Sequence, residues 1–286
     1  MSRTTFQELL DAGVHFGHLK RKWNPAMAPY IFMERNGIHI IDLEKTSYKI
    51  DEAASAMKQI AKSGRKVLFV ATKKQAKDIV AEKVGSVNMP YVTERWPGGM
   101  LTNFPTIRKA VKKMASIDKM ATDGTFDNLS KREKLQITRQ RAKLEKNLGS
   151  IADMTRQPSA LFVVDVTKEH IAVHEAKRLG IPVFAMVDTN SDPSDIDFVI
   201  PANDDAAKSI SLVVDIMCQA INEGLNERKA EKDKEAPSAE KEEAAEGKRK
   251  GKPRSIDFEE EHESAKEEEE EVEKAVAEDA VEEDEE

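Results

Sequence analysis

Short, mainly apolar runs recur along this sequence after Gly64, at residues 66–71, 161–166 and 183–187. The first two runs are each followed by a segment in which apolar residues repeat with helical spacing. A strand that is apolar on both faces must be covered on both faces, which is typical of parallel sheets with helices on either side. The pattern therefore predicts a three-layer α/β domain with a mainly parallel sheet.

Further elements follow from the same periodicities. Helices are predicted at residues 6–12, 45–63, 73–84, 169–179 and 204–223, and shorter strands at residues 38–41, 91–92 and 198–200. Residues 15–25 mix aromatic, histidine, cationic and turn-forming residues with no clear period. We therefore expect an irregular, exposed segment there.

The strand signal stops between residues 103 and 150, where two helical runs occupy about 105–121 and 131–148. A turn with Gly124 separates the runs, and Ser130 is a suitable N-cap for the second one. At a rise of about 1.5 Å per residue, two such helices form a hairpin about 25 Å long. We predict a helical hairpin inserted at about 104–150.

Charge is distributed unevenly along the chain. The total of 45 Lys+Arg and 53 Asp+Glu gives −8, but residues 227–286 hold 26 acidic and 12 basic residues, a net charge of −14. Residues 1–226 are therefore basic, at +6, and the segment 103–152 alone carries +7. The C-terminal segment has few large apolar residues and cannot offset an ordering cost of about 1–2 kcal/mol per residue. We predict an α/β body over 1–226 and a disordered acidic tail over 227–286.

The sequence also limits the location of the protein. Its one cysteine, Cys218, allows no disulfide within the chain, which fits a reducing cytoplasm. The N-terminus has no secretory signal, and no apolar run approaches the roughly 20 residues of a membrane helix. We expect no membrane partner.

An enzyme is one interpretation of an α/β fold, but the sequence contains neither of the common glycine-rich phosphate-binding motifs. Asp165 and Asp188 follow apolar strands, with Asp192 four residues further on, so a magnesium-dependent phosphohydrolase is the alternative function. The segment 188–193 is also rich in turn and capping residues, which favours a structural role.

No cofactor and no small-molecule substrate is expected. A structural magnesium or zinc ion is considered at three residues, His18, Asp188 and Asp204. His170 and His174 have helical metal-ligand spacing but no evident third ligand, and we interpret them as exposed helix residues.

Basic residues gather in four clusters, several of them beside aromatic residues or glycines, and this combination suits RNA. Cations bind phosphates, a helix N-terminus adds N–H donors, and aromatic rings stack on unpaired bases. Each cluster taken alone is also compatible with a solvated surface, and Trp96 is equally compatible with the core. The residues predicted to contact RNA are His15, His18, Lys20, Arg21, Lys22, Trp23, Lys73, Lys74, Arg95, Trp96, Gly98, Gly99, Asn103, Arg108, Lys109, Lys112, Lys113, Lys131, Arg132, Arg139 and Arg141.

Several long motifs occur in an order that resembles a known family. They are residues 10–18 (LDAGVHFGH) with 23–25 (WNP), 38–46 (IHIIDLEKT), 95–103 (RWPGGMLTN), 180–193 (GIPVFAMVDTNSDP) and 200–206 (IPANDDA). Over about residues 2–225 the sequence resembles the bacterial type of the small-ribosomal-subunit protein S-two family.

The resemblance implies a flavodoxin-like domain with an inserted helical hairpin and no enzymatic activity. It further implies binding to small-subunit ribosomal RNA at the junction of head and body. Contact with neighbouring small-subunit proteins is implied too, as is recruitment of the flexible ribosomal protein S-one for translation initiation. The acidic tail is longer than the usual C-terminus of the family, so the resemblance says nothing about it. A third interpretation makes that tail the functional part and the body only its anchor.

Overall fold

The computed structural model describes residues 3–124, 126 and 129–246. The chain divides into two units, residues 1–233 and 234–286, and the strands of the described residues all lie in the first unit. Among the described residues, no helix is both long and apolar enough to cross a membrane.

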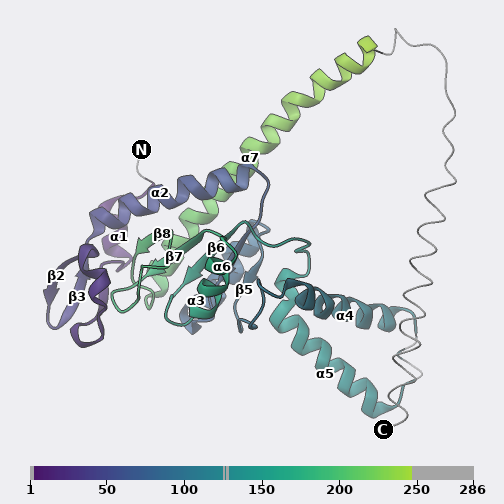
Figure 1. Ribbon diagram of the computed structural model, residues 1–286, viewed down its shortest axis with the longest axis horizontal. Coiled ribbons are helices and arrows are strands. Elements are labelled where there is room, and N and C mark those ends of the chain that lie inside the picture. Colours follow the sequence, from purple (N-terminus) through teal and green to yellow (C-terminus); the bar gives the residue numbers. More distant parts are fainter. Residues whose placement is uncertain (1–2, 125, 127–128, 247–286) are drawn as a thin grey trace. The chain divides into compact units, whose positions relative to one another are not determined.

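A five-stranded parallel sheet forms the centre of the first unit (Figure 1). Its strands are β4 (Val67–Val70), β5 (Tyr91–Val92), β6 (Ala160–Val164), β7 (Val183–Val187) and β8 (Phe198–Pro201). The spatial order is β5-β4-β6-β7-β8, and all four neighbouring pairs are parallel. In sequence rank this order is 2-1-3-4-5, which is the order of flavodoxin-like folds. The predicted fold class is confirmed.

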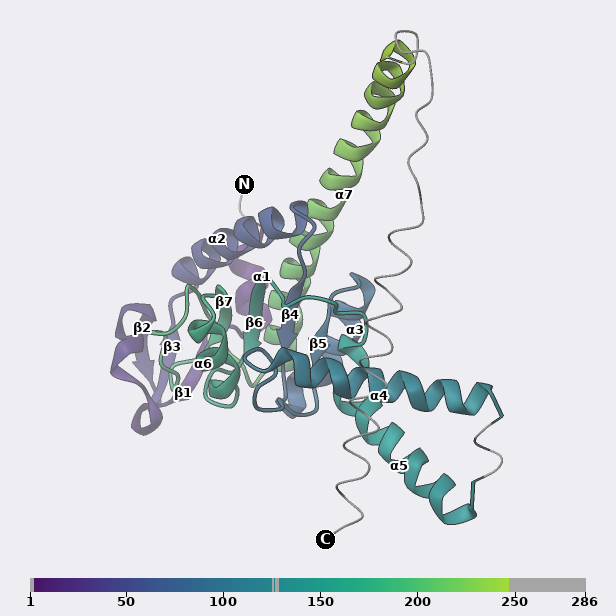
Figure 2. The ribbon, with the colours of Figure 1, turned by 45° about the vertical axis from the view of Figure 1, so that its right-hand side comes forward.

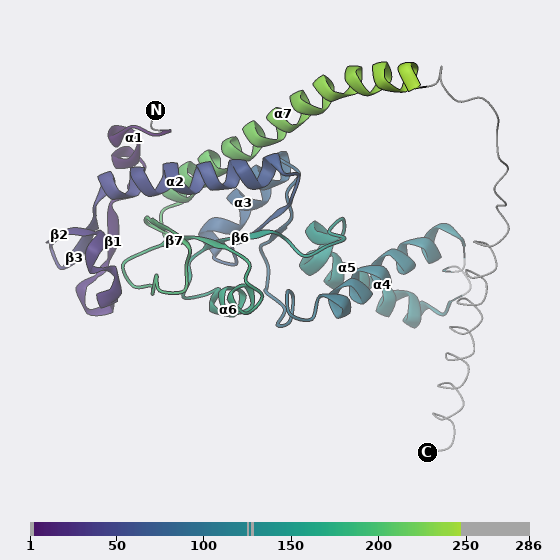
Figure 3. The ribbon, with the colours of Figure 1, turned by 45° about the horizontal axis from the view of Figure 1, so that its top comes forward.

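Helices cover both faces of this sheet, as Figure 3 shows, with α2, α3 and α7 on one side and α6 on the other. The helices are α1 (Phe6–Asp11), α2 (Leu43–Lys62), α3 (Lys74–Ser86), α6 (His170–Arg178) and α7 (Ala207–Glu246). Alternate residues of each strand enter different cores because successive side chains point to opposite faces. In β6, Phe162 joins the core beneath α2, α3 and α7, whereas Val163 joins the core beneath α6.

The predicted helical hairpin is present as α4 (Phe104–Thr122) and α5 (Lys131–Leu148) (Figure 2). Ser130 caps α5 through a reciprocal pair of hydrogen bonds with Glu133. The buried residues Phe104 and Leu148 lie at the base of the hairpin and pack into the core beneath α6. Along the rest of both helices almost all side chains are exposed or half-buried. The sheet therefore anchors the hairpin only at its base.

The prediction for the N-terminal region was partly wrong. Residues 15–25 are not wholly irregular, because β1 (Phe16–Leu19) joins β2 (Ile31–Arg35) and β3 (Ile38–Ile41) in a second, antiparallel sheet of order β1-β3-β2. The pairing of β1 contains an irregularity, and its burial does not alternate. A strand without period-2 alternation carries no sequence signal. Short 3-10 turns follow at Lys20–Lys22 and Pro25–Tyr30, and another ends the hairpin at Gly149–Ile151.

The last helix is longer than predicted and extends to Glu246 instead of ending near residue 223. Residues 227–246 are rich in alanine, glutamate and lysine, which favour helix. Lys58 and Lys62 of α2 form ion pairs of 2.6 Å and 2.5 Å with Glu227 and Glu231. The segment predicted as disordered therefore starts within a helix, and its remainder, 247–286, lies outside the described residues.

The assigned core can be tested at Phe162, in the central sheet. Its side chain is fully buried against Phe69, with ring centroids 5.1 Å apart. Replacing Phe162 by alanine is expected to lower the free energy of unfolding by about 3–5 kcal/mol, since the deletion leaves a cavity. Urea unfolding followed by circular dichroism measures the change. Phe32→Ala is the control, because that ring is 70% exposed. Equal effects of the two changes would contradict the assigned core.

Candidate nucleic-acid interface and the carboxylate cluster

The hairpin presents most of its cations to solvent. Eight of them are exposed and form no ion pair with another described residue: Lys109, Lys112, Lys113, Lys119, Lys131, Arg132, Arg139 and Lys143. We call these eight residues the hairpin cations. The pattern of alternating apolar and basic residues on the two helices thus places the charge outward, where polyanions can reach it.

Other predicted hairpin contacts are engaged within the protein. Arg108 is half-buried and donates a hydrogen bond of 3.0 Å from Nη1 to the carbonyl oxygen of Met154. Arg141 forms ion pairs with Asp118 and Glu145, and these partners raise its pKa. A guanidinium held in this way has less of its charge available for a phosphate. Arg108 and Arg141 are therefore less available to RNA than the hairpin cations.

The N-terminal basic cluster is exposed as predicted. Lys20, Arg21 and Lys22 all lie on the surface, and Lys20 forms an ion pair of 2.7 Å with Glu34. Trp23 is only half-buried, with its ring 5.1 Å from that of His39. The cluster therefore combines two exposed cations, Arg21 and Lys22, that form no ion pair with a described residue, with part of an aromatic face.

Close backbone packing ties this cluster to the large sheet. His18 N–H donates to Thr189 Oγ1 at 2.8 Å, and Asn24 N–H donates to the carbonyl oxygen of Thr189 at 2.8 Å. Gly17 leaves no room for a side chain, since a Cβ there would lie 2.6 Å from Thr189 Cγ2. The loop after β7 thereby holds β1 and the basic cluster in place.

A buried glutamate, which the sequence reasoning missed, organises the loop at 95–103. Both carboxylate oxygens of Glu175 on α6 accept hydrogen bonds from this loop: from the backbone N–H groups of Gly99, Leu101 and Thr102, the Thr102 hydroxyl, and Trp96 Nε1, at 2.8–3.2 Å. Burial alone would raise the pKa of Glu175, but these bonds outweigh it and lower the pKa. The sequence signal that could have revealed this role is an acidic residue placed among the buried alanines and valine of α6.

The predicted RNA contacts of this loop fall into two groups, one buried and one exposed. Trp96 is buried, so its ring belongs to the core and is not offered to RNA. Arg95, Gly98 and Asn103 remain exposed and Gly99 is half-buried. The surface of the loop is thus formed by one cation, one amide side chain and exposed backbone.

Lys73 lies in the interior and not on the surface. Its ammonium is 2.8 Å from Asp204, 2.7 Å from Asp205 and 3.3 Å from Asp165. Burial opposes its charge, but the hydrogen bonds to Asp204 and Asp205 prevail and raise the pKa of Lys73. The neighbouring Lys74 is exposed and stays available to a phosphate.

This ion-pair network occupies the crevice in which flavodoxin-like folds bind ligands. The sheet order reverses between β4 and β6, and ligands of such folds sit outside the carboxyl ends of the strands at that point. Here Lys73 follows β4 and Asp165 follows β6, and both side chains are buried. Asp192, the third carboxylate of the phosphohydrolase alternative, is exposed and accepts hydrogen bonds from Ser194, as a turn residue does. The geometry gives no support to that alternative.

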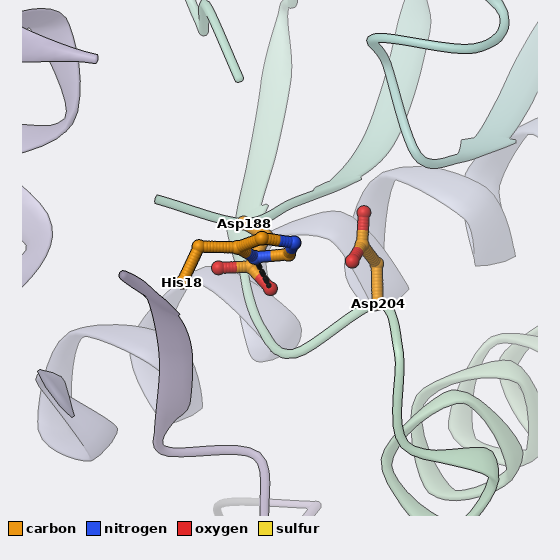
Figure 4. Close-up of side chains that lie close together, drawn as sticks. All are labelled: His18, Asp188 and Asp204. Carbon is orange, nitrogen blue, oxygen red and sulfur yellow. Dashed lines mark ion pairs between the residues drawn. The ribbon is translucent and has the colours of Figure 1, made fainter. Parts of the chain in front are cut away.

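The three residues considered for a metal ion do come together at the strand ends (Figure 4). His18, Asp188 and Asp204 each offer one ligand atom, and these atoms all lie within 4.8 Å of one another. His18 Nδ1 is 3.0 Å from Asp188 Oδ2, an approach that leaves this oxygen without a well-aligned hydrogen bond.

Charges within this cluster influence one another. The close approach of the Asp188 carboxylate is the main cause of the raised pKa of His18. Burial, together with the charges of Asp188 and Asp165, raises the pKa of Asp204 to about 7, although Lys73 acts against this. The cluster holds more negative charge than its one lysine neutralises.

The fold is that of a flavodoxin-like α/β protein with an inserted basic hairpin, and comparisons with known proteins agree with it. The family model for ribosomal protein S2 matches residues 9–224. The chain therefore belongs to the ribosomal protein S2 family, whose members are structural proteins of the cytoplasmic small ribosomal subunit and not enzymes.

Curated relatives are similar over most of their length. The chain is 80% identical over 232 residues to small ribosomal subunit protein uS2 of Phocaeicola vulgatus, which covers 81% of this chain and 83% of the relative. Identity to the protein of the same name from Parabacteroides distasonis is 76% over 253 residues, or 88% and 90% of the two chains. For Bacteroides thetaiotaomicron the identity is 78% over 232 residues, or 81% and 84%.

Glu175→Gln removes the charge that holds the loop at 95–103. Because hydrogen bonds to a charged group contribute about 1.5–3 kcal/mol each, we expect the free energy of unfolding at pH 7 to fall by about 1–3 kcal/mol. The carboxylate has a lowered pKa in the folded state, so its stabilisation is complete above about pH 4.5 and disappears as the pH falls further.

Urea unfolding of both proteins between pH 3 and 7 measures this difference. The difference in the free energy of unfolding between the native protein and Glu175→Gln should become smaller below about pH 4.5. A difference in the free energy of unfolding that stays constant from pH 3 to pH 7 would show that the charge of Glu175 has no stabilising role. Glu82→Gln changes an exposed glutamate of α3 that has no ion pair among the described residues; it is the matched control and should show little change at any pH.

Proposed function

We propose that this chain binds the RNA of the small ribosomal subunit mainly through its helical hairpin and acts there as a structural protein. The observation that carries the proposal is the set of hairpin cations, eight exposed side chains without an ion pair to any other described residue. Each cation that meets a phosphate releases condensed counterions, and this release provides much of the affinity of basic proteins for RNA. The net charge of +7 over residues 103–152 supports an electrostatic role.

Two further surfaces contribute contacts in this proposal. The first is the N-terminal cluster, where Lys20, Arg21 and Lys22 adjoin the half-buried Trp23. The second is the loop held by Glu175, with Arg95 and Asn103 exposed. Lys and Arg position the RNA backbone, whereas the partly exposed ring offers a stacking face. We propose the junction of head and body of the subunit as the binding site, as the family resemblance implies.

The hairpin assignment can be tested by neutralising four cations together. Lys109, Lys112, Lys113 and Arg139 changed to glutamine should weaken binding to small-subunit ribosomal RNA. The plot of log affinity against log salt should flatten by about 0.7–0.9 for each phosphate contact that is lost. Filter binding at several salt concentrations measures both quantities.

Arg141→Gln is the matched control, because Arg141 lies on the same hairpin but is held by Asp118 and Glu145. It should leave the salt slope nearly unchanged. Circular dichroism checks that the hairpin remains helical in both proteins. An unchanged slope for the fourfold variant would mean that the hairpin cations face solvent in the complex, and that the proposal is wrong.

An exposed apolar face on the small sheet suits a protein partner. Phe16 and Met33 both pair with Ile40 across the sheet, so the three side chains share one face. Phe16 is 51% and Met33 48% exposed, and a shallow hollow beside them is lined by Phe16, Ile38 and Ile40. Clustered exposed apolar groups mark interaction surfaces. We propose that ribosomal protein S-one, the partner implied by the resemblance, docks on this face.

Phe16→Ser combined with Met33→Ser should weaken association with protein S-one by at least about tenfold, since burying each apolar side chain contributes on the order of 1.5–3 kcal/mol. Co-sedimentation of protein S-one with small subunits that contain the variant measures the loss. Tyr48→Ser removes an even more exposed ring from α2 and should have no effect. Undiminished binding by the double variant would place protein S-one elsewhere.

A further inference from the structure

The turn between β2 and β3 carries the one Asn-Gly pair of the sequence, Asn36 and Gly37. Both residues have a positive φ, at 54° and 75°, and they join strands that pair at Arg35 and Ile38. A two-residue loop with both φ values positive is typical of a type I′ turn, for which Asn-Gly is a preferred sequence. The fold thus selects these two residue types, and it also places a side-chain amide directly before an unshielded backbone nitrogen.

Neither of these two groups is protected by the rest of the protein. Arg35, Asn36 and Gly37 are all exposed. Among the described residues, the side-chain amide of Asn36 and the backbone N–H of Gly37 have no hydrogen-bond partner. A Cβ placed on Gly37 would meet no atom within 4 Å, so the space around it is open. Segments with few buried contacts open locally at a low free energy, so the turn can rearrange and bring the two groups together.

We propose that Asn36 and Gly37 form a site of spontaneous deamidation. The Gly37 backbone nitrogen attacks Cγ of Asn36, the bond from Cγ to the side-chain nitrogen breaks, and ammonia leaves with the proton of the Gly37 N–H. Water then opens the resulting cyclic imide at either carbonyl carbon, which gives aspartate or isoaspartate. The reaction needs no oxidant and no cofactor, and glycine favours it because no side chain hinders its nitrogen.

Asn88 is a natural comparison within the same chain. It is exposed and has the same φ of 54°. The next residue is Met89, whose side chain is 6% exposed and whose N–H donates to the carbonyl oxygen of Val84 at 3.4 Å. The nitrogen that would attack is therefore covered and hydrogen-bonded after Asn88, whereas it is accessible after Asn36.

Deamidation at Asn36 changes the docking face proposed above for protein S-one, and this consequence rests on that proposal. Asn36 and Arg35 line the same hollow as Phe16 and Ile40. Either product places a negative charge next to Arg35 in the sequence, and isoaspartate also adds a carbon atom to the main chain between β2 and β3. Strand register determines which side chains share a face, so the extra atom disturbs the pairing of Met33 with Ile40. Docking on the face should weaken as a result.

Ageing of the full-length protein tests the modification. The native protein is incubated at neutral and at mildly alkaline pH, and samples are digested with pepsin at low pH, which suppresses deamidation during digestion. Mass spectrometry then follows the mass increase at each asparagine and separates aspartate from isoaspartate. We expect Asn36 to react at least about tenfold faster than Asn88, because burial and a hydrogen bond add to the barrier at Met89. The rate at Asn36 should rise with pH, since the Gly37 N–H loses its proton during the attack.

Asn36→Gly is the matched variant, because glycine keeps the type I′ turn and removes the reacting amide. Circular dichroism checks that it folds as the native protein does, and no mass increase is expected at its turn. Isoaspartate formed at Asp123, which also precedes a glycine, carries no mass increase and is not counted. The inference is overturned if Asn88 reacts as fast as Asn36. It is also overturned if Asn36 stays intact in the folded protein over a period in which it reacts in urea.

A second measurement keeps the modification separate from the docking proposal. Native protein and Asn36→Gly are both aged and incorporated into small subunits, and the protein S-one that co-sediments is compared. Binding should fall in proportion to the fraction of modified Asn36 and stay constant for the variant. Equal binding by the two aged proteins would show that deamidation does not alter the docking face. If the double variant of Phe16 and Met33 binds protein S-one normally, the docking proposal fails, while the mass measurement still decides whether Asn36 is modified.

Discussion

A sheet whose strands are apolar on both faces must be covered by other elements on both faces, and the arrangement of this protein follows from that requirement. Phe162 and Val163 are neighbours in β6, yet they belong to different cores because they point to opposite faces. One face is covered by α2, α3 and the beginning of α7, and the other by α6, the loop at 95–103 and the base of the hairpin. Both predicted surface features, the loop and the hairpin, are thus continuations of the second covering layer.

The carboxyl edge of the sheet shows how a common fold can carry a different function. In a ligand-binding relative of this topology, the crevice between β4 and β6 stays open. Here Lys73 and three aspartates fill it with a buried ion-pair network. Breaking such a network by removing one partner is costly, because a charge is left uncompensated in the interior. Asp165, which suggests a phosphohydrolase centre in the sequence, therefore helps to connect strand ends in the structure.

Much of the fold could be predicted because its elements have strong local signals. The five apolar strands, the hairpin with its cap at Ser130, and the helices between strands all appear close to their expected positions. The strand at Phe16–Leu19 was missed because it is short, irregularly paired and not alternating. Among the predicted RNA contacts, Lys73 and Trp96 proved to be buried. Their surroundings depend on Asp204, 131 residues away, and on Glu175, 79 residues away, so no local pattern reveals them.

The attachment of the hairpin at its base alone affects how the protein unfolds locally. Phe104 and Leu148 bind the hairpin to the core at its base, while the outer turns of α4 and α5 pack mainly against each other among the described residues. Segments with few buried contacts exchange their amide hydrogens through local opening, at a lower free energy than unfolding of the whole domain. A polyanion bound along the hairpin would stabilise those turns by mass action and leave the protection of the sheet unchanged. We therefore expect the hairpin to open as a unit of its own, at a lower free energy than the sheet.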